Sequence, residues 1–219
     1  MSTLSKLQVN NAGVFGVIVN TKEPTTLKIG DDYIAGANSG LLKNVLKQTY
    51  KTAENCVRIN YYGIKQVTEA LIPLLQVSNL ARIVNVSSSL GQLKLISNEK
   101  AKKELGDADG LTEEKVDEVV KGFLEDVKED LVETKGWPIN VSAYIVSKAA
   151  LNAYTRVLAK RYPNFPINAV NPGYVQTELN YNTGVLTVEE GAKGPVMLAL
   201  MPDGGPSGLF FDWIEISSF

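Results

Sequence analysis

The strongest constraint on the fold of this chain is a short β-branched run at residues 81–86, Ala-Arg-Ile-Val-Asn-Val. Such a run is typical of a strand that is buried on both faces of a parallel sheet. Further strand candidates lie at residues 6–9, 167–170 and 208–213, and helical patterns separate them. Because strands that alternate with helices form parallel sheets with helices on both faces, the sequence predicts an α/β fold.

The spacing of apolar residues predicts three helices within this alternation. The first spans about residues 41–76 and could be broken once. The second spans residues 141–161 and is closed by Pro163, and the third spans residues 187–200. Residues 20–40 are polar and rich in turn formers, so we expect a loop there.

A highly charged segment at residues 92–136 contains one further helical pattern. Thr112 can cap this helix, and Glu113 and Glu114 are favourable in its first turn. A solvated surface insertion is the plainest interpretation of a segment with so many charges. The apolar residues at helical spacing are Val116, Val119, Val120, Phe123, Leu124, Val127 and Leu131.

The composition excludes several classes of site. The chain of 219 residues has no histidine, which rules out a Ser-His-Asp triad, a Cys-His pair and imidazole ligands for zinc. Its one cysteine, Cys56, can form neither an internal disulfide nor a cysteine metal cluster, and we expect a buried thiol. We therefore expect no metal site, and acid–base chemistry has to use tyrosine, lysine, serine or carboxylates.

The charge and the hydropathy of the chain limit the classes of partner that it could bind and the compartment in which we expect it. The net charge of −2 gives no strong field for nucleic acid or for an anionic membrane. No apolar run approaches the length of a membrane span, and residues 1–6 have no apolar core of the signal-peptide type. We therefore expect a cytoplasmic protein that binds neither nucleic acid nor membrane.

Tyr144 and Lys148 lie four residues apart near the start of the helix at 141–161. Residues at this spacing share one helix face, so the phenol and the ammonium are expected side by side. A neighbouring ammonium favours the phenolate and lowers the pKa of a phenol, which suits proton transfer to a carbonyl oxygen. Taken alone, the pair is far more often a chance pattern than a functional one, because Tyr and Lys four apart occur in many helices.

Small or polar residues follow three of the predicted strands. Residues 10–13 (Asn-Asn-Ala-Gly) follow the first strand, Ser88 follows the run at 81–86, and Pro172 and Gly173 follow the strand at 167–170. Ligands of open parallel sheets bind outside the carboxyl ends of the strands, so these residues are site candidates. Each of them, taken alone, is equally a plain turn.

The order of these motifs resembles the short-chain dehydrogenase/reductase superfamily over essentially the whole chain. The combination is specific although each piece is not. The resemblance implies a Rossmann-like, doubly wound parallel sheet. The residues that carry it are Asn10, Asn11, Ala12 and Gly13; Asn60 in Arg-Ile-Asn-Tyr-Tyr-Gly; Ser88 in Asn-Val-Ser-Ser; Tyr144 and Lys148; and Pro172, Gly173, Val175 and Thr177.

The resemblance implies a role for each of these residues. Tyr144 would be the general acid in reduction, and Lys148 would hold the nicotinamide ribose and lower the pKa of Tyr144. Ser88 would polarise the substrate carbonyl, and Asn60 would position a water that relays protons to Lys148. Together with Tyr144 and Lys148, the implied cofactor contacts are Asn10, Asn11, Ala12 and Gly13 on the adenosine side, the Pro172-Gly173 turn, and Val175 and Thr177 at the nicotinamide end.

The long separation between Ser88 and Tyr144 resembles that in the monomeric carbonyl-reductase branch of the superfamily. The amino-acid sequence around Tyr144 is similar to that of the plant menthone, neomenthol and salutaridine reductase group. The resemblance implies a monomer in which the inserted helix covers a face that other members use for assembly. It also implies a preference for NADP(H) over NAD(H) and a small-molecule carbonyl or alcohol substrate. We expect residues 91–100, the insertion and residues 178–187 to shape the substrate pocket.

The superfamily's opening strand and its Thr-Gly-x-x-x-Gly-x-Gly loop have no match in these 219 residues. We therefore expect a single incomplete domain over residues 1–219, without the first three strands and their helices and with a helical insertion at about 92–136. The strand at residues 6–9 would then be an exposed edge that could pair with another chain. Two functions follow: an active NADP(H)-dependent carbonyl reductase, or an inactive relative that acts as a binding or partner protein.

Overall fold

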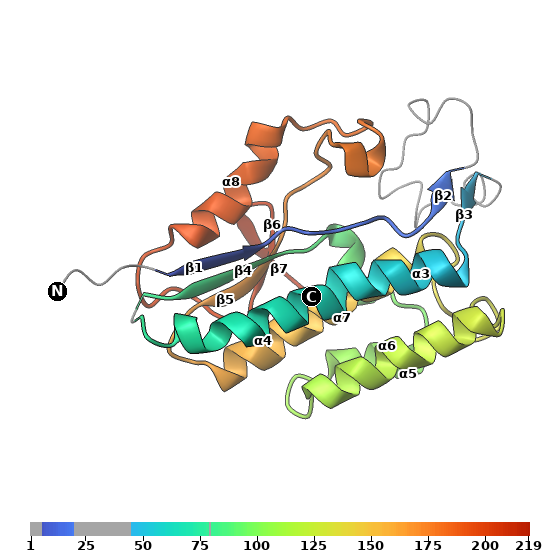
Figure 1. The fold of residues 1–219 in the computed structure, drawn as a ribbon, viewed down its shortest axis with the longest axis horizontal. Coiled ribbons are helices and arrows are strands. Elements are labelled where there is room, and N and C mark those ends of the chain that lie inside the picture. The colour runs from blue at the N-terminus through green and yellow to red at the C-terminus, as the bar shows by residue number, and fades with distance from the viewer. Residues whose placement is uncertain (1–5, 20–44, 79) are drawn as a thin grey trace.

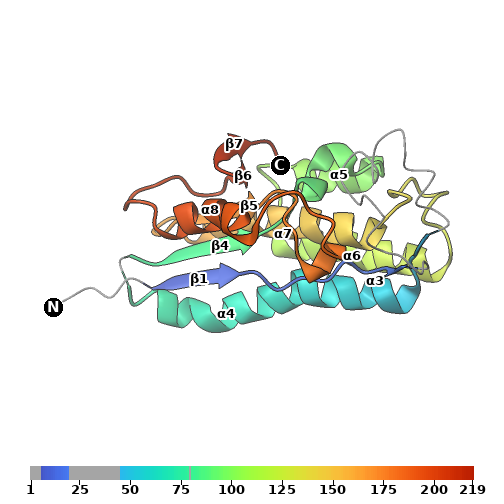
Figure 2. The ribbon, with the colours of Figure 1, turned by 90° about the horizontal axis from the view of Figure 1, so that it is seen from above.

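The computed structural model describes residues 6–19, 45–78 and 80–219. Five strands form one sheet in the order β1-β4-β5-β6-β7, and the first four are parallel, whereas β7 is antiparallel to β6. Figure 2 shows β1 at one border of this sheet and the β6–β7 hairpin at the other. The predicted parallel α/β sheet is confirmed. The strands are β1 (Leu7–Asn10), β4 (Arg82–Val86), β5 (Ile167–Asn171), β6 (Phe210–Asp212) and β7 (Glu215–Ser217).

Helices cover both faces of the sheet, as expected of a doubly wound fold (Figure 1). Helix α8 (Val188–Ala199) lies on one face, where Leu198 packs in a small apolar cluster with residues of β4, β5 and β6. Helices α4 (Ile64–Leu75) and α7 (Ser142–Arg161) lie on the opposite face, over the main core. The β-branched residues of β4 are therefore buried from both sides, which explains their continuous apolar pattern.

The predicted helix over residues 41–76 begins later than the apolar spacing indicates. Residues 41–44 of the predicted helix, and the whole of the predicted loop at 20–40, lie outside the residues that the structure describes. The structure then places β3 (Leu46–Lys47) in an antiparallel pair with β2 (Ile18–Val19), so the prediction is wrong there. The helix starts as α3 (Tyr50–Val57), because Thr49 and Thr52 bond each other's backbone N–H groups in a capping box.

The break expected in this helix is a π-helical segment, η2 (Arg58–Gly63), that joins α3 to α4. A π-turn holds one more residue than an α-turn and commonly occurs at functional sites. Asn60 lies in this segment and is fully buried. The helix therefore continues through the break without a loop, but with a change in the face that its residues present.

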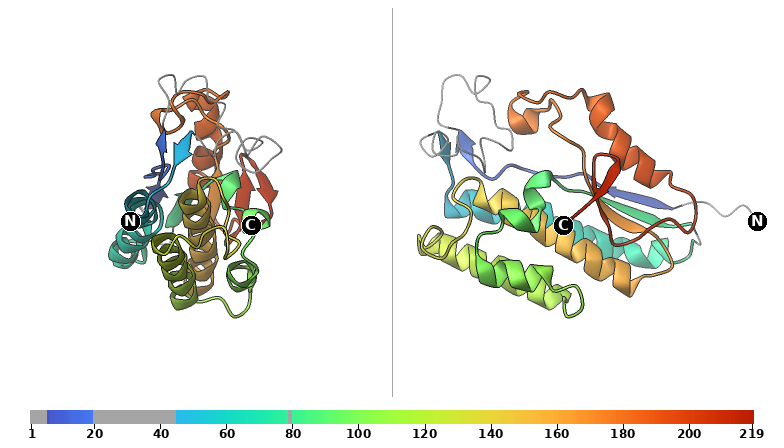
Figure 3. Two further views of the ribbon diagram at one scale, coloured as in Figure 1. Left: turned by 90° about the vertical axis from the view of Figure 1, so that its right-hand side faces the viewer. Right: turned by 180° about the vertical axis from the view of Figure 1, so that it is seen from behind.

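The charged insertion contains two α-helices instead of one. The predicted helix is confirmed as α6 (Glu113–Lys128), with the Thr112 hydroxyl accepting a hydrogen bond from the Lys115 N–H. Helix α5 (Glu99–Gly106) was not predicted, because only two of its residues are buried and its pattern is mostly charged. Val116, Val120 and Phe123 are fully buried. Helix α6 packs on α3 and α7, and α5 packs on α6 and α7. Both lie away from the sheet in Figure 3, so α6 is packed on the core and is more than a solvated surface insertion.

Strand β1 lies at an edge of the sheet, as expected. Its side chains alternate: Leu7 and Val9 are 46% and 43% exposed, whereas Gln8 and Asn10 are buried. Gln8 and Asn10 bond the Thr68 hydroxyl of α4, so one face of this edge strand is covered by a helix. Arg82 N–H donates to the Lys6 carbonyl, and the alternation of a parallel ladder then turns the backbone groups of Leu7 and Val9 outward.

Within the described ranges, no helix combines the length and apolar character that crossing a bilayer requires. The predicted last strand at residues 208–213 is confirmed as β6, and the predicted helices at 141–161 and 187–200 are confirmed as α7 and α8. Strand β7 was not predicted, because the two-residue turn before it contains Trp213 in the left-handed region (φ 59°) and no glycine or asparagine marks it.

Replacing Val9 with Lys is expected to lower self-association of the chain, because a charge on an exposed edge strand opposes pairing with another strand. Sedimentation velocity over a range of protein concentrations measures the change. Val77→Lys, at an apolar residue with 74% exposure beyond α4, is the matched control. Equal association of the two variants and the parent would mean that the β1 edge does not mediate contact between copies.

Candidate active site

The carboxyl ends of β1, β4 and β5 open into one cavity of about 840 Å³. This is the edge at which ligands of parallel sheets bind. The segments that form the cavity are far apart in sequence, and the strand order brings them together. Ten of the residues named from the sequence line it: Asn11, Ala12, Gly13, Ser88, Tyr144, Lys148, Pro172, Gly173, Val175 and Thr177.

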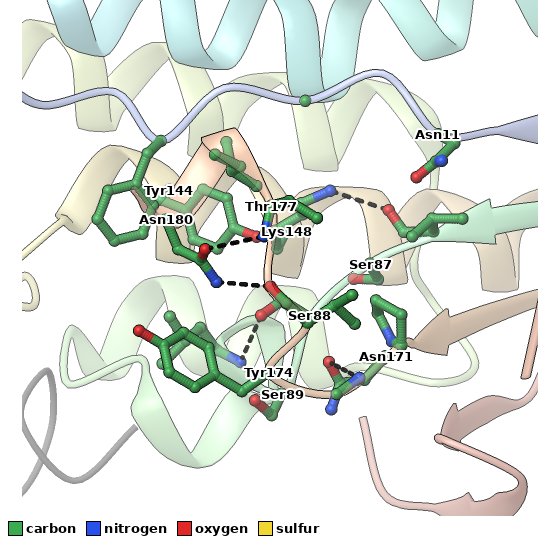
Figure 4. A pocket seen from close by; sticks show the side chains of 18 of the residues that line it. Asn11, Ser87, Ser88, Ser89, Tyr144, Lys148, Asn171, Tyr174, Thr177 and Asn180 are labelled. Carbon is green, nitrogen blue, oxygen red and sulfur yellow. Dashed lines mark hydrogen bonds between the residues drawn. The ribbon is translucent and has the colours of Figure 1, made fainter. Parts of the chain in front are cut away.

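Tyr144 and Lys148 project from the first turns of α7 into this cavity (Figure 4). The Lys148 Nζ donates to the Val86 carbonyl at 2.9 Å and lies 5.7 Å from the centroid of the Tyr144 ring. The ammonium is therefore held at the end of β4, beside the phenol, as the four-residue spacing predicts. Burial of Lys148 disfavours its charged form and lowers its pKa to about 8.

Ser88 follows β4, and its hydroxyl caps the short 3₁₀ segment η3 (Ser89–Gly91) by accepting from the Leu90 N–H at 3.2 Å. This segment lies directly on α7. A side chain at Gly91 would come within 2.8 Å of the Lys148 Cβ, so only glycine allows this approach. Ser88, Tyr144 and Lys148 therefore line the same pocket (Figure 4).

Asn60 lies behind the cavity wall and does not line it. Its Oδ1 accepts from the Val14 N–H at 2.8 Å, and its Nδ2 donates to the Val14 carbonyl at 2.9 Å. A Cβ atom built on Gly13 would lie 3.6 Å from the Asn60 Oδ1 and 3.8 Å from the Lys148 Nζ. The Gly13 backbone therefore lies near both groups, and the role of Asn60 in a proton relay stays a prediction.

Asn10 also lies outside the cavity lining. Its Nδ2 donates to the Thr68 hydroxyl and to the Asn85 Oδ1, and the Asn85 Nδ2 donates to the Thr155 hydroxyl. This buried chain of hydrogen bonds joins β1 to α4, β4 and α7. The side chain of Asn10 thus holds the sheet against its helices, and a contact between Asn10 and the cofactor stays a prediction.

The segment after Gly173 forms the outer wall of the cavity. The expectation for residues 178–187 is met, whereas the described lining includes nothing from residues 91–136, so that part of the prediction is wrong. The wall is closed by its own hydrogen bonds, from the Asn180 Nδ2 to the Val175 carbonyl at 2.8 Å and between the hydroxyls of Tyr174 and Thr183. The lining residues of this wall that the motifs did not indicate are Tyr174, Leu179, Asn180, Thr183 and Val185.

Two further lining residues, Phe15 and Ser87, were not singled out from the sequence. Ser87 is buried, and its hydroxyl has no hydrogen-bond partner among the described residues. A buried hydroxyl without a partner is costly unless a ligand or water satisfies it. The run of three serines gave no reason to choose Ser87, and Phe15 gave no signal because it is one of several apolar residues in a short stretch after Gly13.

Comparison with known proteins identifies relatives over nearly all of the chain. Salutaridine reductase of Papaver bracteatum is 52% identical over 216 residues, which is 96% of this chain and 70% of that protein. Short-chain dehydrogenase/reductase 1 of Saponaria officinalis is 51% identical over 219 residues, which is 96% of this chain and 68% of that protein.

The chain belongs to the short-chain dehydrogenase/reductase family.

Other comparisons agree with this short-chain dehydrogenase/reductase assignment, although no protein-family model matches the chain. The solved structure of salutaridine reductase from Papaver somniferum superposes with a TM-score of 0.84 at 51% identity, over 94% of this chain and 72% of that one. A rat protein named carbonyl reductase [NADPH] 3 is 36% identical over 156 residues, covering 68% of this chain and 55% of that protein. The family and the fold that the motifs implied are confirmed.

The pKa of Lys148 gives this short-chain dehydrogenase/reductase a stability that depends on pH. In the unfolded chain a lysine titrates near pH 10.4. Between about pH 8 and pH 10.4 the folded protein therefore binds fewer protons at Lys148 than the unfolded chain does. The contribution of Lys148 to the free energy of unfolding consequently rises with pH across this window and is smallest below it.

Comparison of the parent with Lys148→Met isolates this contribution. The free energy of unfolding of the parent, relative to the variant, is expected to rise by about 2–3 kcal/mol between pH 7 and pH 10. Denaturant unfolding at several pH values measures the difference. Replacing the exposed Lys121 with Met is the control, and its difference from the parent should stay constant. A constant difference for Lys148→Met as well would contradict the lowered pKa.

Proposed function

We propose that this chain is an NADP(H)-dependent oxidoreductase that interconverts carbonyl compounds and alcohols. The single observation that carries the proposal is that Ser88, Tyr144 and Lys148 line one cavity at the carboxyl edge of the sheet. Two of the residues carry hydroxyl groups that can bond a carbonyl oxygen, and the third carries a buried ammonium next to the phenol. The names of the relatives, which are reductases of the same family, support the proposal.

In the proposed reduction, the side chains of the pocket orient the carbonyl and deliver a proton. The hydroxyls of Ser88 and Tyr144 donate hydrogen bonds to the carbonyl oxygen, which holds the substrate and stabilises the negative charge that develops there. The nicotinamide, when bound, supplies the hydride that the carbonyl carbon accepts. The phenol proton of Tyr144 then moves to the oxygen, and the positive charge of Lys148 stabilises the phenolate that remains. The alcohol oxidation is the reverse of these transfers.

The residues of the cavity fit a nicotinamide cofactor. Because Gly13 has no side chain, a ligand can approach its backbone beside the Lys148 Nζ, and the buried Ser87 hydroxyl needs a partner that a ribose or amide group can supply. We place the adenosine side along Asn11, Ala12 and Gly13, and the nicotinamide end along the Pro172-Gly173 turn, Val175 and Thr177. NADP(H) is preferred to NAD(H), because the rat relative carries NADPH in its name.

Several features of the proposal remain predictions from the sequence. These are the description of residues 1–219 as one incomplete domain with a helical insertion at about 92–136, the monomeric state, the cytoplasmic location and the absence of nucleic-acid and membrane partners. An inactive binding or partner protein was the alternative, and the comparisons do not favour it because the relatives carry the names of enzymes.

The Tyr144→Phe substitution tests the proposed reaction. It removes the hydroxyl that donates the proton, so the rate of NADPH consumption with a cyclic ketone is expected to fall by about 10²–10⁴-fold. Tyr154→Phe makes the same chemical change in the same helix, at a buried hydroxyl that lies outside the cavity and has no partner among the described residues, and should retain activity. Reductase activity that is equal in the parent and in Tyr144→Phe would exclude Tyr144 as the acid.

The cofactor half of the proposal has a separate test. Because the glycine-rich phosphate loop has no match in the sequence, NADPH and the smaller reduced nicotinamide mononucleotide should bind this chain with dissociation constants within about tenfold. A working pyrophosphate site with three charged hydrogen bonds would separate the two by about four to six decades. Calorimetric titration with each compound measures both constants, and a gap of that size would show that another part of the chain binds the pyrophosphate.

A further inference from the structure

The short segment that follows β1 is fixed to α3 and η2 at two points on either side of Phe15. Both backbone polar groups of Val14 are bonded to the Asn60 amide, at 2.8 and 2.9 Å, and the Cys56 thiol also donates to the Val14 carbonyl. On the other side, Gly16 has a φ of +76°, and a Cβ atom there would lie 2.7 Å from the Cys56 Cβ. The backbone on both sides of Phe15 is thus held in one place, and with it the direction in which the Phe15 side chain leaves the chain.

The ring of Phe15 lies against the ring of Tyr144. The two centroids are 5.1 Å apart and the planes are inclined by 59°, which is a favourable geometry for an aromatic pair. Phe15 is half-buried and lines the cavity, and only 7% of Tyr144 is exposed. The Tyr144 ring therefore has the Lys148 ammonium 5.7 Å from its centroid and a second aromatic ring next to it.

We propose that Phe15 is a positioning residue for the Tyr144 phenol, and that the clamp of Asn60 and Cys56 on Val14 and Gly16 holds it in place. The inference rests on the proposed function, because it assigns to Phe15 the alignment of the group that donates the proton. Rotation about the Cα–Cβ bond of a tyrosine moves its hydroxyl, whereas rotation about Cβ–Cγ turns only the plane of the ring, because the oxygen lies on that axis. A neighbouring ring that restricts the rotation about Cα–Cβ keeps the hydroxyl within hydrogen-bond distance of the substrate oxygen.

Replacement of Phe15 with Ala removes this restriction and leaves the hydroxyl of Tyr144 in place. The kcat for reduction of a cyclic ketone is expected to fall roughly 10-fold to 100-fold, as for a catalytic group displaced by about 1 Å. Phe15→Tyr keeps the ring and should stay within about threefold of the parent. Val17→Ala shortens an apolar side chain in the same segment, outside the cavity lining, and is the matched control with unchanged kcat.

A spectroscopic measurement detects the position of Tyr144 independently of activity. In protein labelled with ¹³C at the tyrosine Cζ, the Tyr144 resonance is the one that disappears in Tyr144→Phe. Its chemical shift should change and its line should broaden in Phe15→Ala, and both should match the parent in Phe15→Tyr. The resonances of the other tyrosines should keep their chemical shifts. Val17→Ala should leave all of them unchanged, because a general loosening of the fold would affect several tyrosines.

The outcomes separate this inference from the proposed function. An unchanged Tyr144 resonance in Phe15→Ala overturns the positioning role, as does a parental kcat in Phe15→Ala when Tyr144→Phe is inactive. An effect on the KM for the ketone alone, with kcat unchanged, also overturns it, because Phe15 would then only shape the pocket wall. A parent without any reductase activity contradicts the proposed function, and in that case the resonance alone decides the inference.

Discussion

Helix α7 is buried along almost its whole length, and the site and the core both depend on this burial. Of its 20 residues, 17 are buried, because the sheet lies on one side of the helix and α3, η2 and α6 lie on others. A helix enclosed in this way cannot turn or slide without disrupting several interfaces. The backbone positions of Tyr144 and Lys148 in its first turns are therefore fixed. The part of the cavity wall that these two residues form is rigid for the same reason.

The burial of α7 also means that its polar side chains must find partners inside the protein. Lys148 bonds the Val86 carbonyl, Asn152 bonds the Gly91 carbonyl, and Thr155 accepts from Asn85. Each of these contacts joins the helix to β4 or to the segment that follows β4. The same interactions that satisfy buried polar groups thus align the carboxyl end of β4, which carries Ser88, with the start of α7.

Features that repeat locally could be predicted from the sequence. The β-branched residues of β4 indicate a buried strand, and the spacing of Tyr144 and Lys148 places both on one helix face. The short strand β3 could not be predicted where the apolar spacing indicated helix, because it depends on pairing with β2, far away in sequence. Ser87 and Phe15 were missed for a similar reason: their importance comes from what lies next to them in space.

The π-helical segment η2 joins α3 to α4 and determines which of their residues face the neighbouring segments. Because this segment holds one extra residue, α3 and α4 are each in phase with a different set of neighbours. Upstream, Cys56 faces the Val14 carbonyl, and downstream, Thr68 faces Gln8 and Asn10. Loss of one residue from η2 would close this wide turn to a regular α-turn, and α4 would keep its phase relative to α3, because the wide turn accommodates the extra residue within a single turn. Loss of one residue from α3 or α4 would instead turn the rest of the helix by about 100°. One half would then lose its partners, so a deletion is tolerated less well in these helices than in the charged segment between α5 and α6.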